Sequence, residues 1–162
     1  VYISAAEYAQ EYVWFVTPYL IITDEMKHAL GLAARRGVDV RIITPGIPDK
    51  KLVYGITRSY YHKLVQCGVR VFEYTPGFVH AKMSVADDVL ATCGTINLDY
   101  RSLYHHFECA AYLKECPCLG DIEKDFRRTL GKCRAVTLQT LKYEKWYFRL
   151  LGPILKAFAP LL

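Results

Sequence analysis

The sequence predicts an α/β fold in which a mixed, largely parallel sheet is flanked by helices and followed by a helical C-terminal tail. Short apolar runs alternate with amphipathic segments of helical length through the first half of the chain, and turn residues separate them. The chain has 162 residues, of which 52% are hydrophobic, so it can bury a core and is too apolar to be disordered. We therefore expect one domain over residues 1–162, with an apolar helical tail at 135–162.

The first half of the chain reads as helices and strands in alternation. The segment "TDEMKHALGLAARRG" has Thr23 or Asp24 as its N-cap and Gly37 as its stop signal. A later helix ends at Gly68. Besides that capped helix, the expected elements are a helix tail over 2–11, strands over 12–17, 38–44 and 69–74, and a helix over 51–66.

The pattern changes after residue 77. Apolar runs over 80–86 and 89–93 flank Asp87-Asp88, which predicts a tight hairpin. A further strand is expected over 107–113, and the chain reads as helical from about Cys118 onward. The terminal "WYFRLLGPILKAFAPLL" either packs on the core as a helix or lies on a bilayer as an interfacial segment.

The net charge does not identify a binding partner, whereas the cysteine and carboxylate patterns argue against a disulfide-rich protein and against a metal site. The net charge of +5 is compatible with an anionic lipid surface, with nucleic acid, or with an ordinary solvated surface. Six cysteines do not form a disulfide framework, and "CPC" has no second ligand pair for zinc, so reduced thiols are expected. No carboxylate cluster suits Mg²⁺. We expect neither a metal nor a cofactor.

No apolar run reaches the roughly 18 residues needed to span a bilayer, and no signal peptide is visible. The chain begins at Val1 and its first methionine is Met26, which suggests a fragment of a longer protein.

The strongest functional signal is the spacing H-x-K-x-x-x-x-D, formed by His80, Lys82 and Asp87. In an extended segment His80 and Lys82 project from the same side, about 7 Å apart. This pairing suits phosphodiester chemistry, because an imidazole can attack phosphorus or protonate a leaving oxygen while an ammonium offsets phosphoryl charge. Asp87 has an odd offset from His80 and faces away, so we expect it to cap the turn.

Residues downstream of Gly94 add candidate ligands for the same phosphate. Thr95 and Asn97 offer donors for phosphoryl oxygens, although each could instead brace the loop. Asp99 and Arg101, within "NLDYRS", could bind a headgroup or brace the loop. Glu108 could hold the second ring nitrogen of the catalytic imidazole.

The alternatives are structural. His80 could be an ordinary core histidine, and Lys82 a solvated charge. An ammonium on an otherwise apolar strand is costly without an anion, which favours the catalytic interpretation of Lys82.

Taken together, "HAKMSVAD", "GTINLDYRS" and "FE" resemble the HKD motif of the phospholipase D superfamily. The segments "TPYLI", "GVDVRIITPGIPDKK", "RSYYHKL" and "GVRVFEYTPGFVHAK" are similar to the second, C-terminal catalytic half of bacterial cardiolipin synthases. The resemblance implies histidine-based transfer of a phosphatidyl group between two phosphatidylglycerols. It also implies that one histidine forms a phospho-histidine while another protonates the leaving alcohol. Similarity to the second half favours the acid–base role for His80, and the sequence does not order the two roles.

The resemblance further implies partners and a location. A second HKD half is expected, either in the same full-length chain or by homodimerisation, together with a phospholipid substrate and a membrane surface rather than nucleic acid. The full-length protein would be associated with the cytoplasmic side of a bacterial inner membrane, with this fragment soluble or peripheral. Two other functions remain open: a single-HKD nuclease or phosphodiesterase acting as a homodimer, and a non-catalytic membrane-docking fragment.

Overall fold

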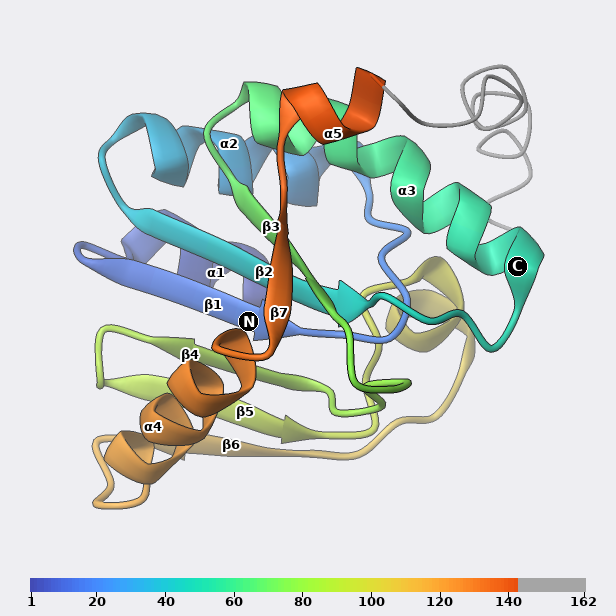
Figure 1. Cartoon of the computed structure of the whole chain (residues 1–162). Helices are drawn as coiled ribbons and strands as arrows, with labels where there is room; N and C mark the ends of the chain where they lie inside the picture. The colour runs from blue at the N-terminus through green and yellow to red at the C-terminus, as the bar shows by residue number, and fades with distance from the viewer. Residues whose placement is uncertain (143–162) are drawn as a thin grey trace.

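The computed structural model describes residues 1–142, which form a seven-stranded sheet with helices on both faces (Figure 1). The strand order is β6-β5-β4-β1-β2-β3-β7. The strands are β1 (Tyr12–Val16), β2 (Asp39–Pro45), β3 (Arg70–Tyr74), β4 (Met83–Ala86), β5 (Leu90–Gly94), β6 (Ala110–Lys114) and β7 (Cys133–Val136). The helices are α1 (Tyr2–Tyr8), α2 (Asp24–Arg35), α3 (Lys51–Gln66), a short π-helix η1 (Arg101–His105), α4 (Leu119–Leu130) and α5 (Leu138–Lys142).

The α/β class is confirmed, but the expectation of a largely parallel sheet is wrong. Only β1–β2 and β2–β3 are parallel, whereas β1–β4, β4–β5, β5–β6 and β3–β7 are antiparallel. A parallel pair needs a long crossover, which α2 and α3 supply between the first three strands. After β3, a tight hairpin makes β4 and β5 antiparallel, the segment containing η1 returns the chain as antiparallel β6, and α4 carries it across to β7, which pairs antiparallel with β3.

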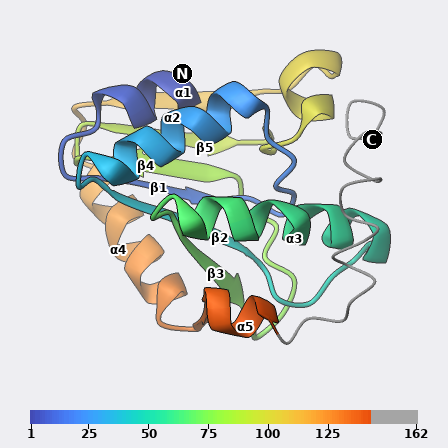
Figure 2. The ribbon, with the colours of Figure 1, turned by 90° about the horizontal axis from the view of Figure 1, so that it is seen from above.

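Alternation along β1 divides the core between the two faces of the sheet. Val13 and Phe15 belong to the larger cluster, which packs under α1, α2 and α3 (Figure 2). Trp14 and Val16 point to the other face, where Phe126 of α4 covers them. Because side chains of a strand alternate faces, the unbroken apolar run at 12–16 indicates a strand buried on both sides.

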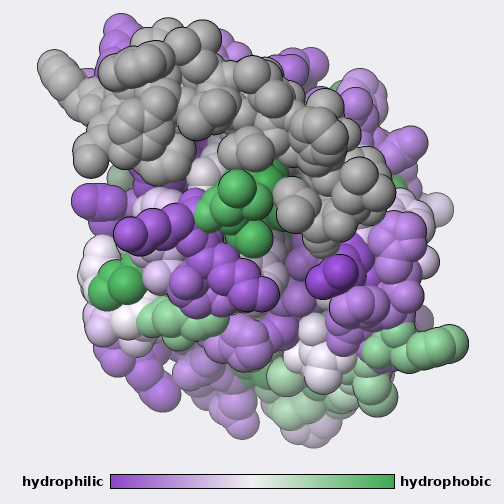
Figure 3. All heavy atoms as spheres, turned by 90° about the vertical axis from the view of Figure 1, so that its right-hand side faces the viewer, coloured by the Kyte–Doolittle hydropathy of each residue, from purple (hydrophilic) through white to green (hydrophobic). Residues whose placement is uncertain are grey.

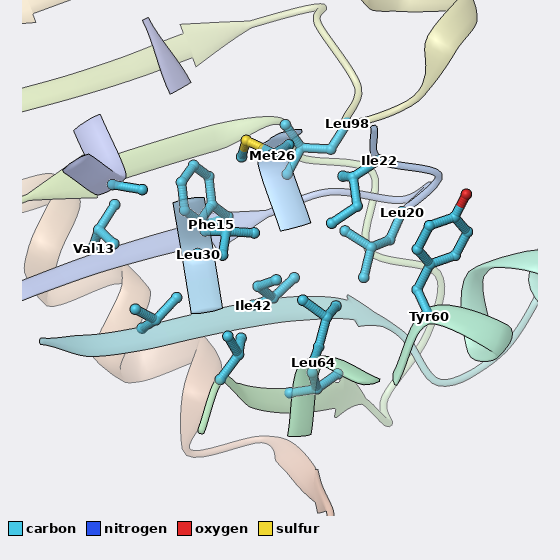
Figure 4. Packing of buried hydrophobic residues seen from close by; sticks show 14 of the residues in the cluster. Val13, Phe15, Leu20, Ile22, Met26, Leu30, Ile42, Tyr60, Leu64 and Leu98 are labelled. Atoms are coloured by element: carbon cyan, nitrogen blue, oxygen red, sulfur yellow. The ribbon is translucent and has the colours of Figure 1, made fainter. Parts of the chain in front are cut away.

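The larger cluster also anchors two loops near the functional residues. Leu20 and Ile22, which follow β1, and Leu98, which follows β5, all lie in the core beside Tyr60 of α3 (Figure 4). Leu20 and Leu98 form an isolated parallel bridge, and the amide of Ile21 donates to the Leu98 carbonyl at 2.8 Å. These contacts fix both loops relative to the sheet.

The predicted hairpin is confirmed. Asp87 and Asp88, the two central residues of the turn, have φ of 50° and 53°, and the Val89 amide donates to the Ala86 carbonyl at 3.0 Å. This geometry is that of a type I′ turn, which suits the twist of a two-residue hairpin and favours Asp, Asn and Gly.

The carboxylate of Asp87 accepts three backbone N–H groups from the segment that enters β1. Its oxygens lie 2.7 Å from Gln10 N, 3.0 Å from Glu11 N and 2.7 Å from Tyr12 N. Asp87 therefore ties the hairpin turn to the start of the central strand and lies at the sheet edge opposite His80. The expected structural role agrees with this position.

Replacing Asp87 by Ala should lower the free energy of unfolding by about 1–3 kcal/mol, because three backbone N–H groups, two exposed and one partly buried, lose a charged acceptor and Ala is strained at positive φ. Asp87→Asn, which tolerates the left-handed conformation and keeps one acceptor oxygen, should lose about half as much. Urea unfolding of the two variants measures this. An Ala variant as stable as the native chain would show that these hydrogen bonds contribute nothing.

Three sequence expectations differ from the structure. The strand expected from residue 80 begins at Met83, and the one expected from 107 begins at Ala110. β7 was missed, so residues 135–136, assigned to the helical tail, belong to a strand. Its sequence "CRAV" is short and its central residues are exposed, so it carries no alternating apolar pattern. Within the predicted helical tail, Leu138–Lys142 form α5, and residues 143–162 lie outside the described residues. Over residues 1–142, no helix combines the length and hydropathy required to cross a membrane.

Candidate active site

Strand pairing brings the predicted site residues to one edge of the sheet. Val16, at the end of β1, pairs with Met83, at the start of β4, and Met83 pairs in turn with Cys93 near the end of β5. Gly94, the last residue of β5, pairs with Ala110, the first of β6. The segments before β4, after β5 and before β6 therefore meet at the carboxyl edge of β1, which lies on the right-hand side of Figure 1.

His80 and Lys82 contact each other at this edge. The Lys82 Nζ lies 2.9 Å from His80 Nε2 and 2.8 Å from the His80 carbonyl oxygen. Both residues precede β4 rather than lying within it, yet their side chains share one side, as their spacing predicts. Because the ammonium donates to Nε2, the ring proton of a neutral His80 belongs on Nδ1. Burial lowers the pKa of Lys82, and the nearby carboxylates of Glu108 and Asp99 partly oppose this.

Gly94 allows the segments carrying Thr95 and Glu108 to approach each other. A Cβ at Gly94 would lie 2.3 Å from the Cys109 carbonyl oxygen and 2.4 Å from the Ala110 Cα, so no other residue fits. As a result, the Thr95 hydroxyl donates to Glu108 and accepts from the Cys109 amide at 3.0 Å.

Ser102 joins the remaining polar residues of the site. Its hydroxyl donates to Glu108 Oε1 at 2.9 Å and accepts from Asn97 Nδ2 at 3.0 Å. Its amide donates to Asp99 Oδ1 at 2.7 Å. Both Ser102 and Asp99 are buried. Ser102 was not predicted as a site residue, although it lies within the "NLDYRS" run, and η1 turns it back toward Asn97.

This network sets the ionisation of the two acids. Hydrogen bonds from Thr95 and then Ser102 hold the pKa of Glu108 below its usual value. Burial raises the pKa of Asp99, against the hydrogen bonds from Ser102. Glu108 therefore gives up its proton more readily than an ordinary glutamate, and Asp99 less readily than an ordinary aspartate.

The contact expected between Glu108 and His80 is not made in this structure. Both carboxylate oxygens of Glu108 are engaged by Thr95 and Ser102, and the Nε2 of His80 faces Lys82. The electrostatic effect of Glu108 on Lys82 shows that the carboxylate nevertheless lies near the His80–Lys82 pair. Glu108 therefore interacts electrostatically with Lys82 and forms no hydrogen bond with His80.

Aromatic side chains flank His80 on the other side. The Phe78 ring lies 5.7 Å from the imidazole between centroids, and Tyr19 lies 6.4 Å from Phe78. The Tyr19 hydroxyl donates to Asp49 at 2.5 Å, and burial together with this bond raises the pKa of Tyr19 to about 12. Tyr19 and Phe78 were not proposed from the sequence as site residues, although both lie in segments that carried the family resemblance.

Two further expectations concern Arg101 and metals. The Arg101 side chain is exposed and forms no hydrogen bond or ion pair with other residues of the 1–142 segment. Within that segment no three His, Cys, Asp or Glu residues lie together as a metal site would require. All six cysteines are free, with Cys116 Sγ 3.0 Å from Cys118 Sγ.

Comparison with known proteins identifies the family. Residues 2–130 match the family described as "Cardiolipin synthase, PLD-like domain". The chain belongs to this phospholipase D-like family. The domain is 36% identical over 154 residues to a cardiolipin synthase of Halalkalibacterium halodurans, an alignment covering 95% of this chain and 31% of that protein. It is 55% identical over 162 residues to an uncharacterized protein of Streptococcus mutans, covering 100% of this chain and 35% of that protein.

Solved structures share the fold of this phospholipase D-like domain. The phospholipase D family member Nuc from Salmonella typhimurium superposes with a TM-score of 0.72 at 18% identity, covering 83% of this chain and 88% of that one. A phosphatidylserine synthase of Haemophilus influenzae Rd KW20 gives a TM-score of 0.71 at 16% identity, covering 99% of this chain and 44% of that one. The chain spans about a third of the length of the curated relatives it matches.

Ser102 provides a test of the network in this phospholipase D-like domain. Ser102→Ala should reduce the turnover of any phosphodiester substrate about 10–100-fold, because Asn97 and Glu108 lose their common partner and their positions are no longer fixed. The loss should fall on kcat rather than KM, and Ser102→Thr should restore part of it by returning the hydroxyl. Equal damage from Ala and Thr, or a loss confined to KM, would exclude a positioning role.

Proposed function

We propose that this domain carries one of the two catalytic histidines of a phosphatidyltransferase that makes cardiolipin from two molecules of phosphatidylglycerol. The observation that carries the proposal is the His80–Lys82 contact at the sheet edge where Asn97, Ser102 and Glu108 converge. Membership of the family described as cardiolipin synthase, PLD-like domain, supports the choice of substrate.

The reaction proceeds through two displacements at phosphorus. A histidine nitrogen attacks the phosphorus of the first phosphatidylglycerol, and the bond to the headgroup oxygen breaks. The departing glycerol takes a proton from the second histidine. A headgroup hydroxyl of the second phosphatidylglycerol then returns a proton to that histidine and attacks the phosphorus, which releases the nucleophile and gives cardiolipin. We assign His80 the acid–base role.

The neighbours of His80 serve the transferred phosphoryl group. When the substrate enters, the Lys82 ammonium leaves His80 Nε2 and donates to a phosphoryl oxygen instead. The new hydrogen bond offsets the negative charge of the phosphoryl group and leaves Nε2 free. The amide of Asn97 has a second N–H available beyond the one bonded to Ser102, and it donates to another nonbridging oxygen. Glu108 keeps Lys82 charged by its proximity.

The second histidine must come from another HKD half, either elsewhere in a longer chain or in a second copy. The chain covers 31% of the H. halodurans cardiolipin synthase, which leaves room in that relative for another such domain. A catalytically complete protein, meaning one that contains both halves, is therefore the material for activity measurements.

Product analysis tests the proposal. The complete protein, incubated with phosphatidylglycerol vesicles, should release glycerol and form cardiolipin in equal amounts. The 162-residue chain held as a monomer should form almost none. Phosphatidic acid as the sole product would indicate hydrolysis, and abundant cardiolipin from the monomer would overturn the two-histidine scheme.

A homodimeric nuclease is the second candidate, and the net charge of +5 is the observation that favours it, because it would attract the phosphates of DNA. Such an enzyme would cleave single- or double-stranded DNA without added lipid, and its binding would weaken steeply with salt. Cleavage of DNA by the chain with no turnover of phosphatidylglycerol would replace the lipid proposal with this one.

The pH dependence of the reaction should report Lys82. Burial lowers the pKa of Lys82 from 10.5, so its positive charge, and with it the rate, should be lost at lower pH than for an ordinary lysine. Lys82→Arg, which stays charged across the range, should move the alkaline limb of the rate profile to higher pH even where its maximum rate is lower. If the substitution leaves the alkaline limb unchanged, the fall in rate at high pH comes from the titration of a group other than Lys82.

A further inference from the structure

We propose that the carboxyl edge of the sheet docks on an anionic phospholipid bilayer through two exposed apolar projections on either side of the His80 site. We call them the η1 rim, residues 101–107, and the α3 rim, residues 47–52. The choice of a phospholipid surface rests on the proposed function, but the docking itself is independent of turnover.

The η1 rim presents aromatic and cationic side chains to solvent. Phe107 is fully exposed and the Tyr104 side chain is 62% exposed. Arg101, His105 and His106 are also exposed, and the rim contains no acidic residue. Leaving a complete phenylalanine side chain in water is unfavourable relative to burying it, and insertion into a bilayer interface would remove that cost.

The α3 rim has the same character. Ile47 and Leu52 are each 51% exposed, in the turn that follows β2 and in the first turn of α3. Lys50 and Lys51 lie between them and are exposed. The carboxylate of Asp49, the acidic residue of this rim, accepts the Tyr19 hydroxyl.

The two rims bracket the site. The η1 rim connects β5 to β6, the α3 rim follows β2, and the strand order places β4 and β1 between them. Because β2 is parallel to β1, the end of β2 and the end of β5 lie at the same edge as His80. Figure 3 looks onto this edge and shows green hydrophobic side chains near the middle, at the left and at the lower right, with purple hydrophilic ones between them.

This combination fits a bilayer better than a protein surface. Apolar side chains next to arginine and lysine suit the boundary between acyl chains and anionic headgroups, where tyrosine is also enriched. Each Lys or Arg close to such a surface adds electrostatic attraction to the anionic headgroups. A docked edge would place the His80–Lys82 pair at headgroup depth, where the phosphodiester lies.

Vesicle sedimentation tests the proposal with matched variants of the full 162-residue chain. One variant replaces both Tyr104 and Phe107 by Ser, and a second replaces Ile47 and Leu52 by Ser. The control is Tyr8→Ser, because Tyr8 is 79% exposed but precedes β1 and lies at the opposite edge. All are mixed with phosphatidylglycerol vesicles and, separately, with phosphatidylcholine vesicles.

We expect each rim variant to partition onto phosphatidylglycerol at least about tenfold more weakly, with Tyr8→Ser within about twofold of the native chain. Binding should also weaken with salt and be much lower on phosphatidylcholine. In a second measurement, the tryptophan fluorescence of Phe107→Trp should shift to shorter wavelength when phosphatidylglycerol vesicles are added. This measurement reports contact with the bilayer directly and does not depend on a variant that binds less well.

Native-like partitioning of both rim variants, or no emission shift of Phe107→Trp, would overturn the proposal. So would conversion of a dimer to a monomer by the rim substitutions with vesicle binding unchanged, because the rims would then be a protein interface. Binding is measured without turnover, and His80→Ala should bind vesicles as the native chain does. Vesicle docking without cardiolipin formation would therefore refute the proposed reaction while leaving this inference intact.

Discussion

Replacing His80 by Ala in the catalytically complete protein should lower the rate of cardiolipin formation by about 10⁴-fold or more. General acid–base catalysis alone is worth about 10²–10⁴-fold, and the same imidazole acts in both displacement steps, once as acid and once as base. Loss of a nucleophile, should His80 have that role instead, would cost at least as much. The remaining rate would come from binding and from the charge on Lys82.

The measurement pairs activity with thermal unfolding. His80 is exposed, and its side chain contacts Lys82 and Phe78, so its removal should shift the melting temperature by only a few degrees. His62→Ala, on the exposed side of α3, is the control and should leave the rate unchanged within about twofold. A collapse of the melting temperature alongside the rate would show that His80 is a structural residue.

Replacing Glu73 by Ala should have the largest effect on stability, a loss of about 3–5 kcal/mol in the free energy of unfolding. The Glu73 side chain is 1% exposed, and its carboxylate bonds Arg58 of α3, Arg134 of β7 at 2.6 Å and the Tyr54 hydroxyl at 3.2 Å. One carboxylate therefore ties α3 and β7 to β3. Its removal leaves the positive charge of Arg58 in a mostly buried position without this partner.

Chemical denaturation of Glu73→Ala measures the loss, with Asp121→Ala as the control. Asp121 pairs with Lys124 on the surface of α4, where both side chains are largely exposed, so that substitution should change stability by less than about 0.5 kcal/mol. Glu73→Gln should fall between the two, because it retains the volume and one acceptor. A loss below about 1 kcal/mol for Glu73→Ala would mean that the pairs do no more than offset the cost of burying the charges.

The sequence by itself determined the parts of this protein that depend on short-range interactions. Helix α3 begins and ends where its pattern predicts, and Thr23 caps α2 by accepting the Met26 amide at 3.2 Å. The hairpin followed from two consecutive aspartates, which tolerate positive φ. That His80 and Lys82 share one side followed from their spacing, whereas their direct contact at 2.9 Å, in the segment before β4, was not predicted.

The tertiary structure decided what depends on pairing between distant segments. The antiparallel direction of three of the six strand pairs, β1–β4, β5–β6 and β3–β7, is set by connection length and by which edges remain open, and local propensity carries neither. β7 pairs with the free edge of β3, and Arg134 of β7 forms an ion pair with Glu73 of β3. These contacts stabilise the strand although its four residues show no alternation of apolar and polar side chains.

The partner of Glu108 was decided in the same way. A carboxylate near an imidazole suggests a direct hydrogen bond. In the structure, Gly94 allows β5 and β6 to approach closely, and the Glu108 carboxylate accepts hydrogen bonds from Thr95 and Ser102 instead. The π-helix turns Ser102 inward, and no property of serine in the sequence marks it for that position. The residue types of the site could therefore be chosen from the chain alone, while its hydrogen bonds depend on distances of a few ångströms that only the packed sheet fixes.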